Sequence, residues 1–174
     1  MYMACSNEEL PPILQYIYFK DGFAYASNAH ILVKNKLTEI TERISEDELA
    51  ILDGKLIHKS IFKKILVHEK IQITGTGIVC KTPFFSIEYK FSSDDNLKYP
   101  NAELILQKAL KNNGSANKLS LNISLLYKLE QSLYDCRNPI FVFGDKPSDS
   151  ILVKSQDKSV ESFGIIMPVM ISES

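Results

Sequence analysis

The sequence predicts an α+β fold with mostly antiparallel sheet, and three observations support this. Segments with the alternating, β-branched and aromatic composition of strands outnumber those with helical spacing. The strand segments follow one another across short polar turns, which is typical of hairpin meanders and not of β-α-β crossovers. An order of one strand, one helix and three strands also occurs twice, in residues 55–91 and 118–171, which indicates an internal structural repeat.

The first expected elements form a hairpin. After a short polar leader, residues 1–12, β-rich residues flank Asp21-Gly22 and predict strands over roughly 13–20 and 23–34. The acidic stretch 38–52 is predicted to be a loop or one or two helical turns. Helical spacing then predicts a helix within residues 55–66, with an apolar face made by Ile57, Ile61, Phe62, Ile65 and Leu66.

The remaining elements repeat this arrangement. Residues 70–91 alternate in polarity and are broken by glycine and proline, which predicts two or three antiparallel strands. A short helix over 102–111 and a polar linker follow. Asn122 is the expected N-cap of a helix over 123–133, preceded by a strand at 118–122. Three more strands are expected over residues 139–144, 150–155 and 163–171.

This pattern predicts a division of the chain into two portions. The N-terminal portion, residues 13–106, holds the hairpin and the first repeat. A linker, residues 107–117, leads to the C-terminal portion, residues 118–174.

Composition limits the class of protein. With 45% hydrophobic and 24% charged residues, the chain resembles an ordinary globular protein that folds without disulfides or metal. A net charge of −1 argues against bulk electrostatic coating of nucleic acid, although it permits a local basic face. Three widely spaced cysteines, Cys5, Cys80 and Cys136, favour a reducing cytoplasm. No apolar run reaches roughly 18 residues and no signal-peptide pattern is present, so we expect no membrane association.

The sequence contains no recognisable catalytic or metal-binding motif. His30, His58 and His68 lack metal-ligand spacing, and no phosphate-binding or nucleophile motif is present. Acidic runs are typical of solvated loops, and the cysteines lie in apolar contexts. We therefore expect no catalytic residue, no metal and no cofactor. A small hydrolase with His30 as its base is the least favoured hypothesis.

Five motifs resemble, in chain order, the bacterial DNA polymerase III β sliding clamp family. "FGIIMPVMI" is similar to the clamp's last strand, and "KLSLNISLLYKLEQSL" to the strand-helix unit before it. "FSSDDNLKYPNAELIL" resembles the step between two clamp domains, and "GKLIHKSIFKKIL" the helix-bearing half-module before that step. "DGFAYASNAHILV" is similar to a clamp stretch reading Ala-Thr-Asp-Gly-His-Arg-Leu-Ala.

The resemblance covers roughly residues 11–171 and has clear departures. Ala29 replaces the family's glycine and Ile31 its arginine, and the chain is much shorter than a three-domain clamp subunit. The resemblance implies a DNA-clamp-like fold of repeated β-α-β-β-β half-modules, with mostly antiparallel sheet and helices on one face. It therefore implies a shortened, divergent clamp.

A clamp-like fold implies a DNA-facing helical surface. Ammonium groups along one helical face neutralise phosphates without reading bases. The alternative is that these lysines only make an amphipathic helix soluble. The lysines expected to contact the DNA backbone are Lys55, Lys59, Lys63, Lys64, Lys118 and Lys128.

The resemblance also implies a hydrophobic groove that receives a short linear peptide. Methionine suits a surface that accepts several apolar ligands, and proline favours a strand end that is open to a peptide. The alternative is that these are ordinary core residues with His30 at a polar rim. One expected wall is Ser27, Ala29, His30, Ile31 and Leu32, and the other is Met167, Pro168, Val169 and Met170.

These expectations combine into a non-catalytic, sliding-clamp-like scaffold linked to DNA replication. Its expected partners are double-stranded DNA, bound without sequence preference, and short linear peptides of replication or repair proteins. A chain of this length must form a homo-oligomer to encircle DNA. The alternative is a clamp-fold protein-interaction module without ring formation or DNA binding. Solution mass distinguishes the two hypotheses.

Overall fold

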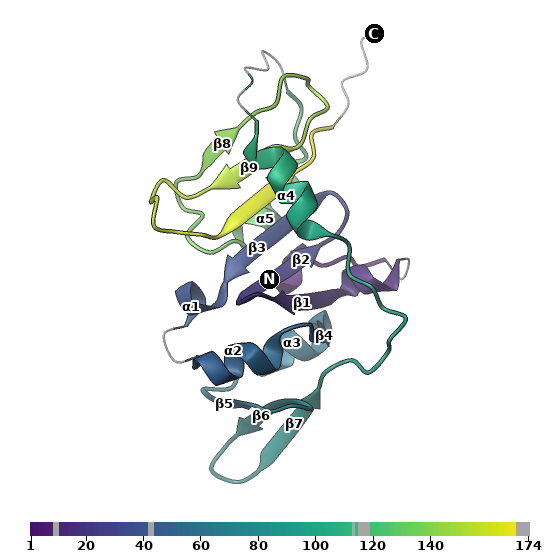
Figure 1. The fold of residues 1–174 in the computed structure, drawn as a ribbon, viewed down its shortest axis with the longest axis vertical. Coiled ribbons are helices and arrows are strands. Elements are labelled where there is room, and N and C mark those ends of the chain that lie inside the picture. Colours follow the sequence, from purple (N-terminus) through teal and green to yellow (C-terminus); the bar gives the residue numbers. More distant parts are fainter. Residues whose placement is uncertain (9–10, 42–43, 113, 115–118, 170–174) are drawn as a thin grey trace.

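The computed structural model describes residues 1–8, 11–41, 44–112, 114 and 119–169. The protein is elongated, with a small sheet at one end and the C-terminal strands towards the other (Figure 1). In chain order its elements are η1 (Tyr2–Ala4), η2 (Pro12–Gln15), β1 (Tyr16–Lys20), β2 (Phe23–Ser27), β3 (Ile31–Lys36), α1 (Leu37–Ile40), α2 (Glu46–Leu52), β4 (Leu56–His58), α3 (Lys59–Ile65), β5 (Lys70–Ile73), β6 (Gly77–Lys81), β7 (Ser86–Lys90), α4 (Ala102–Leu110), α5 (Ile123–Glu130), β8 (Ile140–Val142), β9 (Ile151–Lys154) and β10 (Phe163–Ile166).

A seven-stranded sheet joins the two ends of the chain, in the order β4-β1-β2-β3-β10-β9-β8. All the strand pairs of the described residues are antiparallel, so the predicted α+β class with mostly antiparallel sheet is confirmed. At the centre of the sheet, Ile31 of β3 pairs with Ile166 of β10, and Lys34 pairs with Phe163. The N-terminal and C-terminal strands therefore share one sheet.

Both faces of this sheet are covered because its central strands are apolar on both sides. On one face, Val33 and Val153 belong to the main core with Ile65 of α3 and Leu129 of α5. The opposite face carries α4, visible in front of the sheet in Figure 1. There the buried residues are Tyr25, Leu32, Ala102, Leu106, Ala109, Leu152 and Ile165. The expected placement of helices on one face thus holds for α3 and α5, whereas α4 lies on the other.

The second sheet has three strands in the order β5-β6-β7. Its apolar face, with Ile78 and Cys80, joins the main core next to α3. β6 and β7 approach closely at Gly77, where an added Cβ would lie 2.3 Å from the main-chain oxygen of Tyr89. Together, β4, α3 and these strands form the predicted β-α-β-β-β order.

Capping side chains explain where three helices begin. Ser45 and Glu48 form a reciprocal capping box that starts α2 in the acidic stretch. The Asn101 side chain accepts a hydrogen bond from the Leu104 N–H at 3.0 Å and starts α4. Asn122 accepts one from the Ser124 N–H at 2.9 Å, which confirms it as the N-cap of α5.

A buried amide connects β3 to the segment after α5. The Asn35 side chain donates to the Ser132 carbonyl at 2.8 Å and accepts from the Tyr134 N–H at 3.0 Å. Asn35 and Ser132 are both buried. This amide therefore replaces the solvent as hydrogen-bond partner for two main-chain groups at the junction of the sheet and α5.

Several sequence-based boundaries are wrong. The strand expected over 23–34 is two strands, β2 and β3, because the chain turns at residues 28–30. In the described part of the segment 118–122 there is only a single bridge, between Ser120 and Val169. The expected linker 107–117 begins inside α4, because the helix runs to Leu110. The division into an N-terminal and a C-terminal portion stays a prediction.

Candidate functional site

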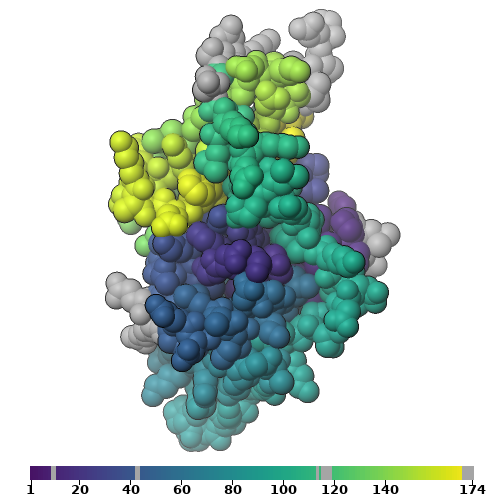
Figure 2. Space-filling view, in the orientation of Figure 1, coloured from purple at the N-terminus to yellow at the C-terminus, as the bar shows by residue number. Residues whose placement is uncertain are grey.

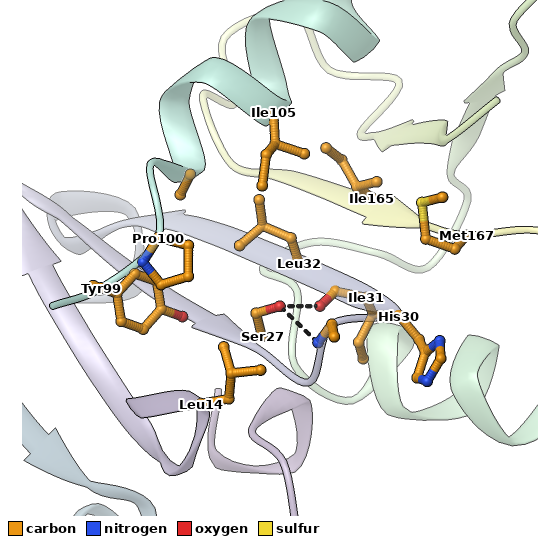
Figure 3. A pocket seen from close by; sticks show the side chains of 12 residues that line it. Leu14, Ser27, His30, Ile31, Leu32, Tyr99, Pro100, Ile105, Ile165 and Met167 are labelled. Carbon is orange, nitrogen blue, oxygen red and sulfur yellow. Dashed lines mark hydrogen bonds between the residues drawn. The ribbon is translucent and has the colours of Figure 1, made fainter. Parts of the chain in front are cut away.

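A cavity of about 270 Å³ opens beside the turn between β2 and β3. Four segments form its walls: η2, the β2–β3 turn, the chain entering α4, and the end of β10 (Figure 3). Most of the side chains around it are apolar. The residues that line it are Leu14, Ser27, Ala29, His30, Ile31, Leu32, Tyr99, Pro100, Ala102, Ile105, Ile165 and Met167.

Local hydrogen bonds fix the turn that forms the first wall. The Asn28 side-chain oxygen accepts from the N–H groups of His30 at 3.0 Å and Ile31 at 2.9 Å. The Ser27 hydroxyl donates to the Ile31 carbonyl at 2.8 Å and accepts from the Ala29 N–H at 3.1 Å. Ala29 has a φ of 72°, in the left-handed region that favours glycine. The clamp family's glycine would adopt this turn with less strain.

The second wall is the end of β10, as expected. The Met167 N–H donates to the His30 carbonyl at 2.8 Å, directly after the Ile31–Ile166 pair. This contact confirms that the two stretches are neighbours in space. Pro168 and Val169 do not line the cavity, because the chain turns away and the Val169 N–H donates to the Ser120 carbonyl at 2.8 Å. Met170 lies outside the described residues.

The third wall, formed by Tyr99, Pro100 and α4, was missed as part of the site. An ionic cluster holds α4 in place: Glu103 accepts from the Tyr25 hydroxyl at 2.5 Å and from the Lys34 ammonium at 2.6 Å. Burial raises the pKa of Glu103, but these two hydrogen bonds outweigh it and keep the pKa below its ordinary value. In the sequence, this wall was indicated by Tyr99-Pro100-Asn101, in which Asn101 is the N-cap of α4. Figure 2 shows α4 and the segment leading to it (teal to green) running along the surface.

The imidazole of His30 is exposed at the rim. Within the described part of the chain, no hydrogen bond involves this ring, and only the His30 main chain is engaged. Nor do the described residues contain a group of three or more His, Cys, Asp or Glu side chains that could hold a metal ion. The cavity beside this ring is lined mainly by apolar side chains.

The lysines proposed for DNA are not equivalent. Lys59 donates to the Ser6 carbonyl and, at 2.6 Å, to the Asn7 side chain, so its ammonium is engaged by the N-terminal segment. Lys63 and Lys64 are exposed on α3, and Lys128 is half-buried on α5; the two helices pack on the same face of the sheet. Lys55 precedes β4 and is partly buried. Lys118 lies outside the described residues.

No helix in the described part of the chain is both long and apolar enough to cross a membrane. Cys5, Cys80 and Cys136 are all free thiols.

Comparison by sequence finds no matching family profile and no matching curated protein. Comparison by structure finds bacterial DNA polymerase III β subunits. The Borrelia burgdorferi protein, in complex with a natural product, aligns with a TM-score of 0.66 and 12% identity over 99% of this chain and 60% of that one. The Helicobacter pylori β clamp bound to a DNA ligase peptide aligns with a TM-score of 0.64 and 12% identity, over 97% of this chain and 60% of that one.

The clamp of Bartonella birtlesii, bound to griselimycin, gives a TM-score of 0.63 and 14% identity over 98% of this chain and 62% of that one. The chain thus spans about three-fifths of the length of these clamps. At such identities the likeness concerns architecture, and it agrees with the observed sheets and helices. This chain has the fold of the bacterial DNA polymerase III β sliding clamps, with a strongly divergent sequence.

Proposed function

We propose that this protein is a non-catalytic, sliding-clamp-like scaffold linked to DNA replication, which docks short apolar peptides of replication or repair proteins in the cavity beside His30. The observation that carries the proposal is the cavity itself. Its two sequence-predicted walls meet through the Met167–His30 hydrogen bond, and Leu32, Ile105 and Ile165 supply apolar surface. One of the clamps with the same fold, from Helicobacter pylori, is bound to a DNA ligase peptide in its solved structure.

The cavity has the chemistry that peptide docking requires. Apolar side chains provide most of the binding free energy of short linear motifs, and a few polar groups fix their orientation. Here the turn at residues 28–30 and the ionic cluster around Glu103 hold the walls before a ligand arrives. A preformed pocket reduces the entropy lost on binding. The proposed groove residues are Ser27, Ala29, His30, Ile31, Leu32 and Met167, with Tyr99, Pro100, Ile105 and Ile165 added.

Ile105→Asp is expected to weaken the binding of a clamp-binding pentapeptide at least about 30-fold, because an ionised carboxylate would be desolvated in an apolar pocket. Leu104→Asp is the matched control. Leu104 precedes Ile105 on α4 and is similarly exposed, at 50% compared with 42%, but it does not line the cavity. Fluorescence anisotropy measures affinity, and the methyl resonance of Met167 reports occupancy. Equal affinity in the two variants, or a Met167 resonance that millimolar peptide does not move, would contradict the proposed groove.

DNA contact is the second component of the proposed scaffold. The observation in its favour is that α3 and α5 pack on the same face, where Lys63 and Lys64 are exposed and Lys128 is half-buried. Such ammonium groups bind phosphates and release counterions. Because Lys59 is already engaged by Ser6 and Asn7, it contributes less than its sequence position implies.

The double variant Lys63→Glu/Lys64→Glu is expected to weaken retention on duplex DNA about tenfold or more at low salt, because two phosphate contacts become repulsive. The control is Lys108→Glu/Lys111→Glu, which reverses two exposed charges at the C-terminal end of α4, on the opposite face. An electrophoretic mobility shift assay across a salt series measures both. Equal retention of the two variants would remove α3 from the DNA-facing surface and favour the interaction module without DNA binding.

A further inference from the structure

Strand β7 has one side that no other strand of the described residues covers. At one end of the β6–β7 ladder, the Phe91 N–H donates to the Thr76 carbonyl at 3.0 Å. At the other end, the Thr82 N–H donates to the Phe85 carbonyl at 2.9 Å. Hydrogen-bonded pairs alternate along an antiparallel ladder, so the even-numbered residues of β7 direct their main-chain N–H and C=O groups away from β6. These groups form a free edge.

The same edge carries apolar side chains that the core does not bury. Ile87 is 37% exposed and Phe85 is 55% exposed, and Phe84 in the adjoining turn is 91% exposed. Ile87 lies opposite Cys80 of β6, so its side chain is on the apolar face of the sheet. Figure 1 shows this sheet at one end of the molecule, away from β8 and β9. A free edge with exposed apolar side chains is a surface on which another strand can pair.

A second copy of β7 fits this edge, and the position of the two-fold axis is restricted. The outward main-chain groups of two antiparallel strands meet only when the axis passes through a residue. An axis at Glu88 would set two carboxylates directly opposite each other, which destabilises a strand pair. An axis at Tyr89 would need the outward side of Ser92, whose N–H already donates to the Leu56 carbonyl at 2.8 Å. An axis closer to the β6–β7 turn would align the turn with the end of β7. The remaining position is Ile87.

We propose that two copies of this protein associate through β7, antiparallel about a two-fold axis at Ile87, so that their three-stranded sheets form one six-stranded sheet. In this register, Ile87 lies opposite Ile87 of the second copy, and Phe85 lies opposite its Tyr89, all on the apolar face. On the other face, the Ser86 hydroxyl lies opposite the Glu88 carboxylate of the second copy. The outward main-chain groups of Ser86 and Glu88 then pair with each other across the axis.

This association is independent of the proposed docking of peptides. A two-fold contact joins two copies and no more, unlike the head-to-tail contacts that build rings. None of the residues that line the cavity beside His30 belongs to β5, β6 or β7, so both cavities of the dimer stay open. The dimer thus presents two cavities, and a partner that carries two docking peptides gains avidity from it.

A pair of lysine substitutions tests the interface. Ile71 and Ile87 lie on either side of Cys80 in one row of the sheet, and they are 51% and 37% exposed, but Ile71 belongs to the opposite edge strand, β5. Ile87→Lys is expected to weaken association at least about 100-fold in sedimentation equilibrium, because two ammonium groups meet at the axis. Ile71→Lys should keep the mass of the wild-type dimer. Circular dichroism verifies that both variants are folded.

A cysteine at the axis gives a measurement that does not depend on a lysine variant. Opposite residues of a pair without hydrogen bonds have Cα atoms about 4.5 Å apart, within the range of a disulfide. Under mild oxidation, Ile87→Cys is expected to form a covalent dimer on a denaturing gel, whereas Ile71→Cys and the wild type stay monomeric. A wild type that is monomeric at millimolar concentration would overturn the proposal. So would equal association of the two lysine variants, or an Ile87→Cys protein that does not cross-link.

Discussion

Replacing Gly77 with alanine is expected to lower the free energy of unfolding by about 3 kcal/mol, because the new methyl group has no space. Its Cβ would lie 2.3 Å from the Tyr89 oxygen and 2.9 Å from the Lys90 Cα. Both atoms belong to the main chain of the paired strand β7, so rotation of a side chain does not relieve the overlap. β6 and β7 must separate, which breaks the hydrogen bonds that join them.

Gly75→Ala is the matched control for this substitution. It changes a glycine in the same hairpin, and no atom lies within 4 Å of its added Cβ. Urea denaturation should show a change of less than about 0.5 kcal/mol for Gly75→Ala. Hydrogen exchange of the β7 amides should accelerate only in Gly77→Ala. If the two variants are equally stable, the strands are not packed as closely as described.

Replacing Asn35 with alanine should cost about 3 kcal/mol, since it leaves two main-chain groups without their partner. The Ser132 carbonyl loses its 2.8 Å donor and the Tyr134 N–H loses its 3.0 Å acceptor at a buried junction. For a chain of this size the melting temperature should fall by roughly 6–12 °C. Asn96→Ala is the control, because Asn96 is exposed and its hydrogen bonds reach only the Asp94 side chain.

Calorimetry on the two asparagine variants decides this prediction. Asn96→Ala should stay within about 0.5 kcal/mol of the wild type. A matching small loss in Asn35→Ala would mean that solvent reaches the junction and replaces the missing amide. In that case the segment after α5 would not depend on β3 for its position.

The elements that could be predicted from the sequence are those indicated by residues close together in the chain. The apolar spacing of Ile61, Ile65 and their neighbours and the Asn122 cap identify helices from adjacent residues. The turn at residues 28–30 was missed because Asn28 and Ala29 are not a typical hairpin pair, and the apolar residues on both sides continue the strand pattern. Conformational preference alone does not show that Ala29 adopts a positive φ.

The site was predicted only in part, for a physical reason. The resemblance to clamps identified the Ser27–Leu32 stretch and Met167. The wall formed by Tyr99 and Ile105 depends on how α4 docks, which the ion pair between Lys34 and Glu103 helps to set across a long sequence separation. Likewise, the engagement of Lys59 by Ser6 depends on the path of the N-terminal segment. The spacing of apolar residues along the sequence gives no information about such contacts between distant residues.

The pairing of β3 with β10 also fixes the order in which a newly synthesised chain gains its cavity. The ribosome releases the β2–β3 turn long before its hydrogen-bonded neighbour Met167. Until then, the cavity beside His30 lacks Ile165 and Met167, two of the side chains that line it. The complete cavity therefore forms only when synthesis has passed β10.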